Sequence, residues 1–227
     1  MTHFGLICPA STGHLNTMLP LGQELKRRGH RVTMIGMLDA EAKTLAAGLE
    51  FLAYGREEFP NGAMAESLHN LSKLSGLAAF RYTIKLFKDG ANILLRDAPQ
   101  VIKNAGVDAL LIDQASSGGS IADFLEIPFI TICSAVVFNQ DENVPPFFTN
   151  GKYNTAWWAK LRNQAGYTLY RRLTKPIREL VADYRRQWNL PLYSQPGDGY
   201  SQLAQICTLN LVMVILNWLK LVTNLLS

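Results

Sequence analysis

The sequence has few cysteines, and their positions suggest neither a disulfide framework nor a metal centre. Cys8, Cys133 and Cys207 are the three cysteines among 227 residues; none forms a Cys-x-x-Cys pair or falls at metal-ligand spacing from the four histidines. Cys8 and Cys133 lie in apolar runs, where a thiol behaves as a small hydrophobic side chain. The chain also opens without the basic and apolar regions of a signal peptide. We therefore expect a cytoplasmic protein with no bound metal.

Charge of either sign is sparse. Charged residues make up 18% of the chain, the net charge is +4, and no run of five like charges occurs. The densest basic stretch, "KRRGHR" at 26–31, falls at the end of a predicted helix, where basic residues complement the helix dipole. This charge is too small and too dispersed to indicate nucleic-acid binding. The hydrophobic share of 48% is typical of a globular chain with a buried core.

Glycine is scarce where a phosphate-binding loop would need it. The first apolar run, "HFGLICPA" at 3–10, is followed by "STGHLNTMLPLG", which matches neither G-x-G-x-x-G nor G-x-x-x-x-G-K-[ST]. Without those glycines the backbone cannot approach a pyrophosphate closely, which argues against a dinucleotide site. The loop has instead a histidine, His14, directly after Gly13.

Apolar runs alternate with amphipathic segments along much of the chain. The predicted strands cover 3–10, 30–37, 49–55, 107–113 and 129–138, and the predicted helices cover 16–29, 39–48 and 119–127. Two longer segments, 62–105 and 155–188, are mostly helical, and the first is expected to break at Gly76 and near Gly90. Pro20 fits its helix if it lies in the first turn. The alternation predicts an α/β fold, a Rossmann-like parallel sheet with helices on both faces.

Two polar residues are expected at the same edge of this sheet. His14 follows the first strand and Asp113 ends the fourth, and ligands bind at the carboxyl ends of parallel strands. An imidazole with a pKa of about 6.5 can act as a general base near neutral pH. A carboxylate on its other nitrogen fixes the tautomer and stabilises the imidazolium. The alternative is structural, with His14 capping the next helix and Asp113 forming a turn.

The stretch "HFGLICPASTGHLNTMLPLGQELKRRGHRVTMIG" resembles the opening of the family-one glycosyltransferases of GT-B architecture, and the bacterial zeaxanthin glucosyltransferases above all. "DALLIDQASSGGSIADFLEIPFITICSA" resembles a later stretch of that family, and the resemblance covers roughly residues 3–200. It implies the N-terminal, acceptor-binding half of such an enzyme, with His14 as catalytic base and Asp113 orienting it. It also implies inversion at the anomeric carbon and a UDP-sugar as co-substrate, without cofactor or metal. Thr17 departs from the family pattern G-H-x-x-P.

In the family this half binds the acceptor. The candidate lining residues follow the first and fifth strands or lie in the loop beyond: Ser11, Thr12, Gly13, Phe138, Phe147, Phe148 and Trp157. Aromatic walls would suit a small lipophilic alcohol. The alternative for Phe138 and Trp157 is an ordinary place in the core.

The family's donor-binding domain has no counterpart in the sequence. We divide the chain into a Rossmann-like acceptor-binding domain at 1–206 and an apolar tail at 207–227, "CTLNLVMVILNWLKLVTNLLS". The tail is either out-of-frame sequence from a truncated gene or a segment that associates weakly with a membrane.

Three functions follow as hypotheses. The first is a truncated glycosyltransferase, inactive alone, that transfers a hexosyl group, glucose by resemblance, from a UDP-sugar to a lipophilic acceptor. The second is a non-catalytic, membrane-attached subunit that works with a separately encoded donor-binding chain. The third is an unrelated α/β binding domain.

Overall fold

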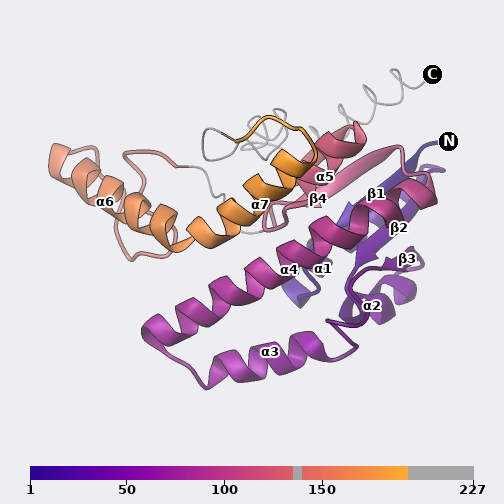
Figure 1. Ribbon diagram of the computed structural model, residues 1–227, viewed down its shortest axis with the longest axis horizontal. Coiled ribbons are helices and arrows are strands. Elements are labelled where there is room, and N and C mark those ends of the chain that lie inside the picture. The colour runs from indigo at the N-terminus through magenta and orange to yellow at the C-terminus, as the bar shows by residue number, and fades with distance from the viewer. Residues whose placement is uncertain (135–139, 194–227) are drawn as a thin grey trace.

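A computed structural model describes residues 1–134 and 140–193 of the chain (Figure 1). One parallel sheet has the strand order β3-β2-β1-β4-β5. Its strands are β1 His3–Ile7, β2 Arg31–Gly36, β3 Glu50–Ala53, β4 Ala109–Asp113 and β5 Phe129–Ile132. The predicted Rossmann-like parallel sheet is therefore confirmed.

Helices connect the strands and continue beyond the sheet. They are α1 Thr12–Arg27, α2 Glu41–Ala46 with a preceding 3-10 turn, Leu38–Ala40, then α3 Ala63–Ser72, α4 Gly76–Ala105, α5 Gly118–Leu125, α6 Trp157–Leu173 and α7 Lys175–Gln187. In the described ranges, no helix combines the length and the apolar character needed to cross a lipid bilayer.

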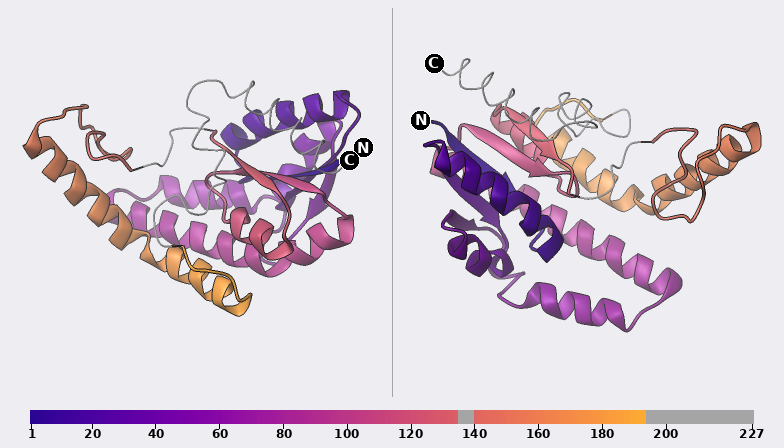
Figure 2. Two further views of the ribbon diagram at one scale, coloured as in Figure 1. Left: turned by 90° about the horizontal axis from the view of Figure 1, so that it is seen from above. Right: turned by 180° about the vertical axis from the view of Figure 1, so that it is seen from behind.

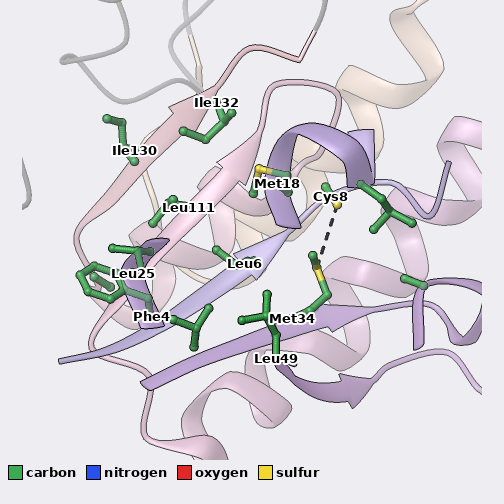
Figure 3. Packing of buried hydrophobic residues seen from close by; sticks show 14 of the residues in the cluster. Phe4, Leu6, Cys8, Met18, Leu25, Met34, Leu49, Leu111, Ile130 and Ile132 are labelled. Atoms are coloured by element: carbon green, nitrogen blue, oxygen red, sulfur yellow. Dashed lines mark hydrogen bonds between the residues drawn. The ribbon is translucent and has the colours of Figure 1, made fainter. Parts of the chain in front are cut away.

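Helices cover both faces of the sheet (Figure 2). On one face, Leu15, Met18 and Leu25 of α1 pack with side chains such as Phe4 and Leu6 of β1 (Figure 3). On the other face, α4 and α5 pack against alternate residues of the same strands. Burial of each such side chain contributes about 1.5–3 kcal/mol, and burial on both sides explains why the strand sequences are continuously apolar.

Helix α1 begins at Thr12, four residues before the predicted start, and its N-cap is Ser11. His14 therefore lies in the first turn of the helix rather than in a loop before it. Pro20 lies inside the helix, so its expected place in the first turn is wrong. The helix tolerates it because Pro20 and Asn16, whose carbonyl would have accepted the missing hydrogen bond, are both exposed to water.

Helix α4 is continuous through Gly90, and the expected break there is also wrong. Glycine in a helix interior costs about 1 kcal/mol, and this cost is outweighed by a buried face that includes Leu94, Leu95 and Ile102. The expected break at Gly76 is confirmed, since α4 begins there with a positive φ of 53°. The predicted 155–188 segment divides at Thr174 into α6 and α7.

Residues 143–178, which we call the arm, comprise the loop before α6, α6 itself and the first turn of α7. The loop and α6 extend away from the sheet (Figures 1 and 2), while α7 returns to pack along α4. The predicted strand 129–138 ends at Ile132, and residues 135–139 lie outside the described ranges. So does the tail 207–227, and with it the boundary at 206.

Candidate active site

The order of the strands creates a switch point between β1 and β4. From β1 the chain proceeds through β2 to β3 on one side, and from β4 it proceeds to β5 on the other side. Leu6 and Ile7 of β1 pair in register with Leu111 and Ile112 of β4, so the two strands end together. In open α/β sheets, ligands bind in the crevice beyond the strand ends at such a point.

His14 and Asp113 meet at this edge, as the sequence predicted. The Nδ1 atom of His14 lies 2.8 Å from Oδ2 of Asp113. The Asp113 side chain is fully buried, whereas the His14 side chain is 25% exposed. A carboxylate on Nδ1 favours the tautomer with the proton on that nitrogen, which leaves Nε2 as the basic nitrogen. The structure thus shows the pairing, and the catalytic role of His14 stays a prediction.

Asp113 also forms the turn that was considered as an alternative. Its Oδ1 accepts a hydrogen bond from the backbone N–H of Ala115 at 2.8 Å, and its carbonyl accepts one from the N–H of Ser116 at 2.9 Å. One oxygen therefore shapes the chain after β4 while the other holds His14. His14 makes no cap, because Ser11 occupies the N-cap of α1.

Ser134 is a member of this cluster that the sequence analysis missed. It lies just beyond β5, and its hydroxyl donates a hydrogen bond to Oδ2 of Asp113, the oxygen that also contacts His14. A buried carboxylate is stable only when it is well hydrogen-bonded, and Ser134 supplies one of the bonds. The sequence pattern did not single it out, because Ser134 lies within the predicted strand 129–138, whereas β5 ends at Ile132.

The hydrogen bond to Asp113 raises the pKa of His14 above its ordinary value, with partial burial of the ring opposing the shift and the charge of Asp113 adding to it. Cys8, at the end of β1, is different. Burial, and secondarily the charge of Asp113, raises the pKa of its thiol far above the normal range. Cys8 therefore stays protonated and packs near Met34 (Figure 3), which confirms its predicted place in the core.

Three of the predicted lining residues flank the histidine. Ser11 is half-buried, while Thr12 and Gly13 are exposed. The hydroxyl of Thr12 accepts a hydrogen bond from Lys43 Nζ at 2.8 Å, and a Cβ added to Gly13 would meet no atom within 4 Å. The first turn of α1 thus offers open space beside His14. Phe138 lies outside the described ranges.

The other three predicted lining residues lie on the arm. Phe147 and Phe148 pack against the ring of Tyr170 at centroid distances of 5.7 and 5.8 Å. Trp157 begins α6 and is 74% exposed, so the alternative of an ordinary core residue is wrong for it. Because α6 extends away from the sheet (Figure 1), the structure does not bring these aromatic residues beside His14.

Two other features were considered as sites. Within residues 1–134 and 140–193, no three His, Cys, Asp or Glu side chains cluster as metal ligands would. An open hollow of about 400 Å³ lies along α4, lined by residues such as Glu58, Lys85 and Arg96. Arg96 pairs with Glu58 and Lys85 pairs with Asp89, so these charges are partnered within the protein, and neither His14 nor Asp113 lines the hollow.

Comparison with known proteins gives relatives with glucosyltransferase names. A zeaxanthin glucosyltransferase of Pantoea ananas is 28% identical over 210 residues, which are 92% of this chain and 48% of that protein. One of Pseudescherichia vulneris is 26% identical over 210 residues, 91% of this chain and 49% of that protein. The chain thus spans about half the length of these relatives. No protein-family profile matches it.

Solved structures share the fold. The glycosyltransferase of kitacinnamycin superposes with a TM-score of 0.60 at 19% identity, over 87% of this chain and 43% of that one. The spinosyn rhamnosyltransferase SpnG gives a TM-score of 0.54 at 17% identity, over 86% and 44%. The chain is thus similar in sequence to proteins named zeaxanthin glucosyltransferase and shares its fold with glycosyltransferases of GT-B architecture, of which it matches about half, consistent with an N-terminal half.

Proposed function

We propose that this chain is the acceptor-binding half of a glucosyltransferase that uses a UDP-sugar and a lipophilic alcohol. The observation that supports this most directly is the His14–Asp113 pair at the switch point between β1 and β4. The two relatives named zeaxanthin glucosyltransferase support the sugar and the acceptor class, since zeaxanthin is a lipophilic molecule with hydroxyl groups.

In the proposed reaction, the acceptor hydroxyl donates a hydrogen bond to Nε2 of His14. As the acceptor oxygen attacks the anomeric carbon, the new C–O bond forms and the bond from that carbon to the diphosphate oxygen breaks. The proton passes to Nε2, and UDP departs with the bonding electrons. Direct displacement inverts the anomeric centre. The Asp113 carboxylate stabilises the imidazolium, and such base catalysis contributes roughly 10²- to 10⁴-fold in rate.

The donor must be held by residues outside the part that matches here. Because the chain spans about half of its relatives, we expect a second domain to bind the UDP-sugar, either in a longer chain or in a separate one. The described fold contributes the base and the acceptor side of the cleft. We therefore expect no sugar transfer from this chain alone.

The test supplies the donor half in trans. The donor-binding half of a zeaxanthin glucosyltransferase is added with UDP-glucose and a lipophilic alcohol, and UDP release is measured. Replacing His14 by Ala should lower the rate by roughly 10²- to 10⁴-fold. His69→Ala is the matched control, because His69 is exposed on α3. An unchanged rate in His14→Ala would contradict general-base catalysis and favour a non-catalytic binding role.

A further inference from the structure

Positive charge is concentrated in one part of the chain. The arm, residues 143–178, contains seven Lys and Arg residues and no Asp or Glu, although the whole chain has a net charge of only +4. The rest of the chain is therefore net acidic. Since the loop and α6 extend away from the sheet (Figure 2), this charge is separated in space as well as in sequence.

Within residues 1–134 and 140–193, much of this charge is not paired with acidic side chains. The guanidinium groups of Arg162, Arg171 and Arg178 donate hydrogen bonds to neutral oxygens: the Lys152 carbonyl, the Gln140 side chain and the Arg171 carbonyl. Two lysines do pair with carboxylates, Lys160 with Glu142 and Lys175 with Glu179. The arm thus keeps a net positive charge in the folded protein.

Large apolar side chains are exposed on the same arm. Trp157, Trp158 and Tyr153 are 74%, 50% and 67% exposed at the start of α6 and in the loop before it. Leu161, one helical turn after Trp157, and Leu169, further along α6, are also exposed. Burial of these side chains against something outside the described part would be favourable by the hydrophobic effect.

The opposite side of α6 packs against the loop that precedes it. Asn163 donates a hydrogen bond to the carbonyl of Glu142 at 2.9 Å, and the hydroxyl of Tyr167 donates one to the carbonyl of Val144 at 3.0 Å. Both side chains are buried under the loop. The loop therefore fixes which side of α6 faces outward, and the tryptophans lie on the outward side.

We propose that the arm binds the surface of an anionic membrane. Tryptophan and tyrosine favour the membrane–water interface, and lysine and arginine are attracted to anionic headgroups. Helix α6 would lie in the plane of the interface with Trp157, Trp158 and Leu161 among the headgroups. The exposed leucines favour lipid over nucleic acid, because a leucine cannot stack on bases as an aromatic ring does.

Membrane binding by the arm does not depend on the proposed sugar transfer, but the two proposals are consistent with each other. A lipophilic alcohol partitions into a bilayer, and an acceptor-binding half held at the membrane surface would meet it there. It also differs from membrane association through residues 207–227, which the sequence analysis considered and which lie outside the described ranges.

The test is flotation of the full chain with vesicles of equal parts phosphatidylcholine and phosphatidylglycerol, and with vesicles of phosphatidylcholine alone. We expect binding to the anionic vesicles that weakens as salt is raised. The double variant Trp157→Ala, Trp158→Ala should lose at least tenfold in binding. Its matched control is Leu77→Ala, Phe87→Ala, which removes exposed apolar side chains of α4.

Two double variants that remove positive charges test the electrostatic contribution to membrane binding. Arg162→Gln, Arg172→Gln should weaken binding to anionic vesicles, while Arg81→Gln, Lys88→Gln on α4 should leave it nearly unchanged. All of these side chains are exposed, so circular dichroism should show intact folds. Three results would overturn the proposal: no flotation, equal flotation of the arm variants and the wild type, or binding to DNA without binding to vesicles.

Discussion

At the scale of single residues, the buried carboxylate of Asp113 is the shared hydrogen-bond acceptor of the candidate site. It receives hydrogen bonds from the backbone of Ala115, from the hydroxyl of Ser134 and from the ring of His14. Removing such a group leaves several donors unpaired at once, so its substitution would mix effects on folding and on chemistry. Substitutions of its neighbours His14 and Ser134 separate these effects better.

The raised pKa of His14 gives the pair a pH dependence of defined sign. The unfolded histidine titrates at about 6.5, and its folded pKa is higher because of Asp113. The stabilisation from the charged pair is therefore fully present below about pH 6.5 and is lost as the pH rises through the folded pKa. We expect the wild type to exceed His14→Gln in unfolding free energy by more at pH 6 than at pH 9.

Urea unfolding at both pH values measures this difference, and NMR titration of the His14 ring measures the pKa directly. His69→Gln serves as the control, since His69 is exposed on α3 and away from Asp113 in the fold. Base catalysis should show the opposite dependence, with the reconstituted rate rising with pH as Nε2 loses its proton. A His14 pKa at or below the ordinary value would contradict the pairing.

Ser134 should act on His14 through Asp113. Ser134→Ala removes a donor from a buried carboxylate, which should cost about 1–3 kcal/mol in unfolding free energy. It should also shift the NMR-measured pKa of His14, because the carboxylate oxygen that contacts the ring changes its partners. Ser134→Thr keeps the hydroxyl and should restore both values. Ser72→Ala, at an exposed hydroxyl on α3, is the control, and equal effects of the two alanine variants would exclude a positioning role.

At the scale of elements, the placement of α1 and α4 depends on close packing against the sheet. A Cβ on Gly22 of α1 would lie 2.6 Å from Leu49 and 2.8 Å from Leu6, so glycine permits this helix to approach β1. That approach contributes to the position of His14 near the strand ends, since Gly22 and His14 belong to the same helix. The glycine therefore contributes to the site without touching it.

A buried arginine attaches α7 to α5. Arg185 is 3% exposed; its Nη1 lies 2.6 Å from Oδ2 of Asp123, its Nε donates to the carbonyl of Pro191 at 2.7 Å, and its guanidinium lies 3.8 Å from the centre of the Tyr193 ring. These contacts hold the chain after α7 against the sheet domain. Through these contacts, α7, which continues from the arm, is attached to α5 of the sheet domain.

Arg185→Ala should lower the unfolding free energy by about 3 kcal/mol. This loss of free energy is at the low end of the range for breaking a buried ion pair, because Asp123 keeps partial contact with water. The adjacent Arg186→Ala is the matched control, since Arg186 pairs with Asp183 at the exposed surface and should change stability little. Urea denaturation measures both, and similar values for the two variants would show that the buried contacts contribute nothing particular.

At the scale of the whole molecule, the two proposals concern two different parts of the chain, the sheet edge and the arm. The sheet edge holds the His14–Asp113 pair, in which His14 is the proposed base, and the arm carries the exposed aromatic and basic residues. The chain matches about half of each relative, and under the proposed function a second domain would complete the cleft. Reconstitution tests the first proposal, and flotation tests the second without any need for catalysis.

The sequence by itself determined the parallel α/β sheet and the placement of His14 and Asp113 at the same edge of it. Both follow from local patterns: buried strands read as continuous apolar runs, and the residues after parallel strands reach the same edge. Helix limits were less well predicted. The start of α1 at Thr12 and the continuity of α4 through Gly90 depend on buried contacts between distant segments, which outweigh the local preferences of proline and glycine.

Only the tertiary structure decided the second hydrogen bond to Asp113 and the position of the arm. Ser134 is 21 residues from Asp113 in sequence, and it meets that carboxylate because β4 and β5 are adjacent and end together. Phe147, Phe148 and Trp157 were candidates to line the acceptor site, whereas in the structure α6 extends away from the sheet and leaves Trp157 exposed. The direction of a helix that follows a long loop is set by what it packs against, and its own sequence does not contain that information.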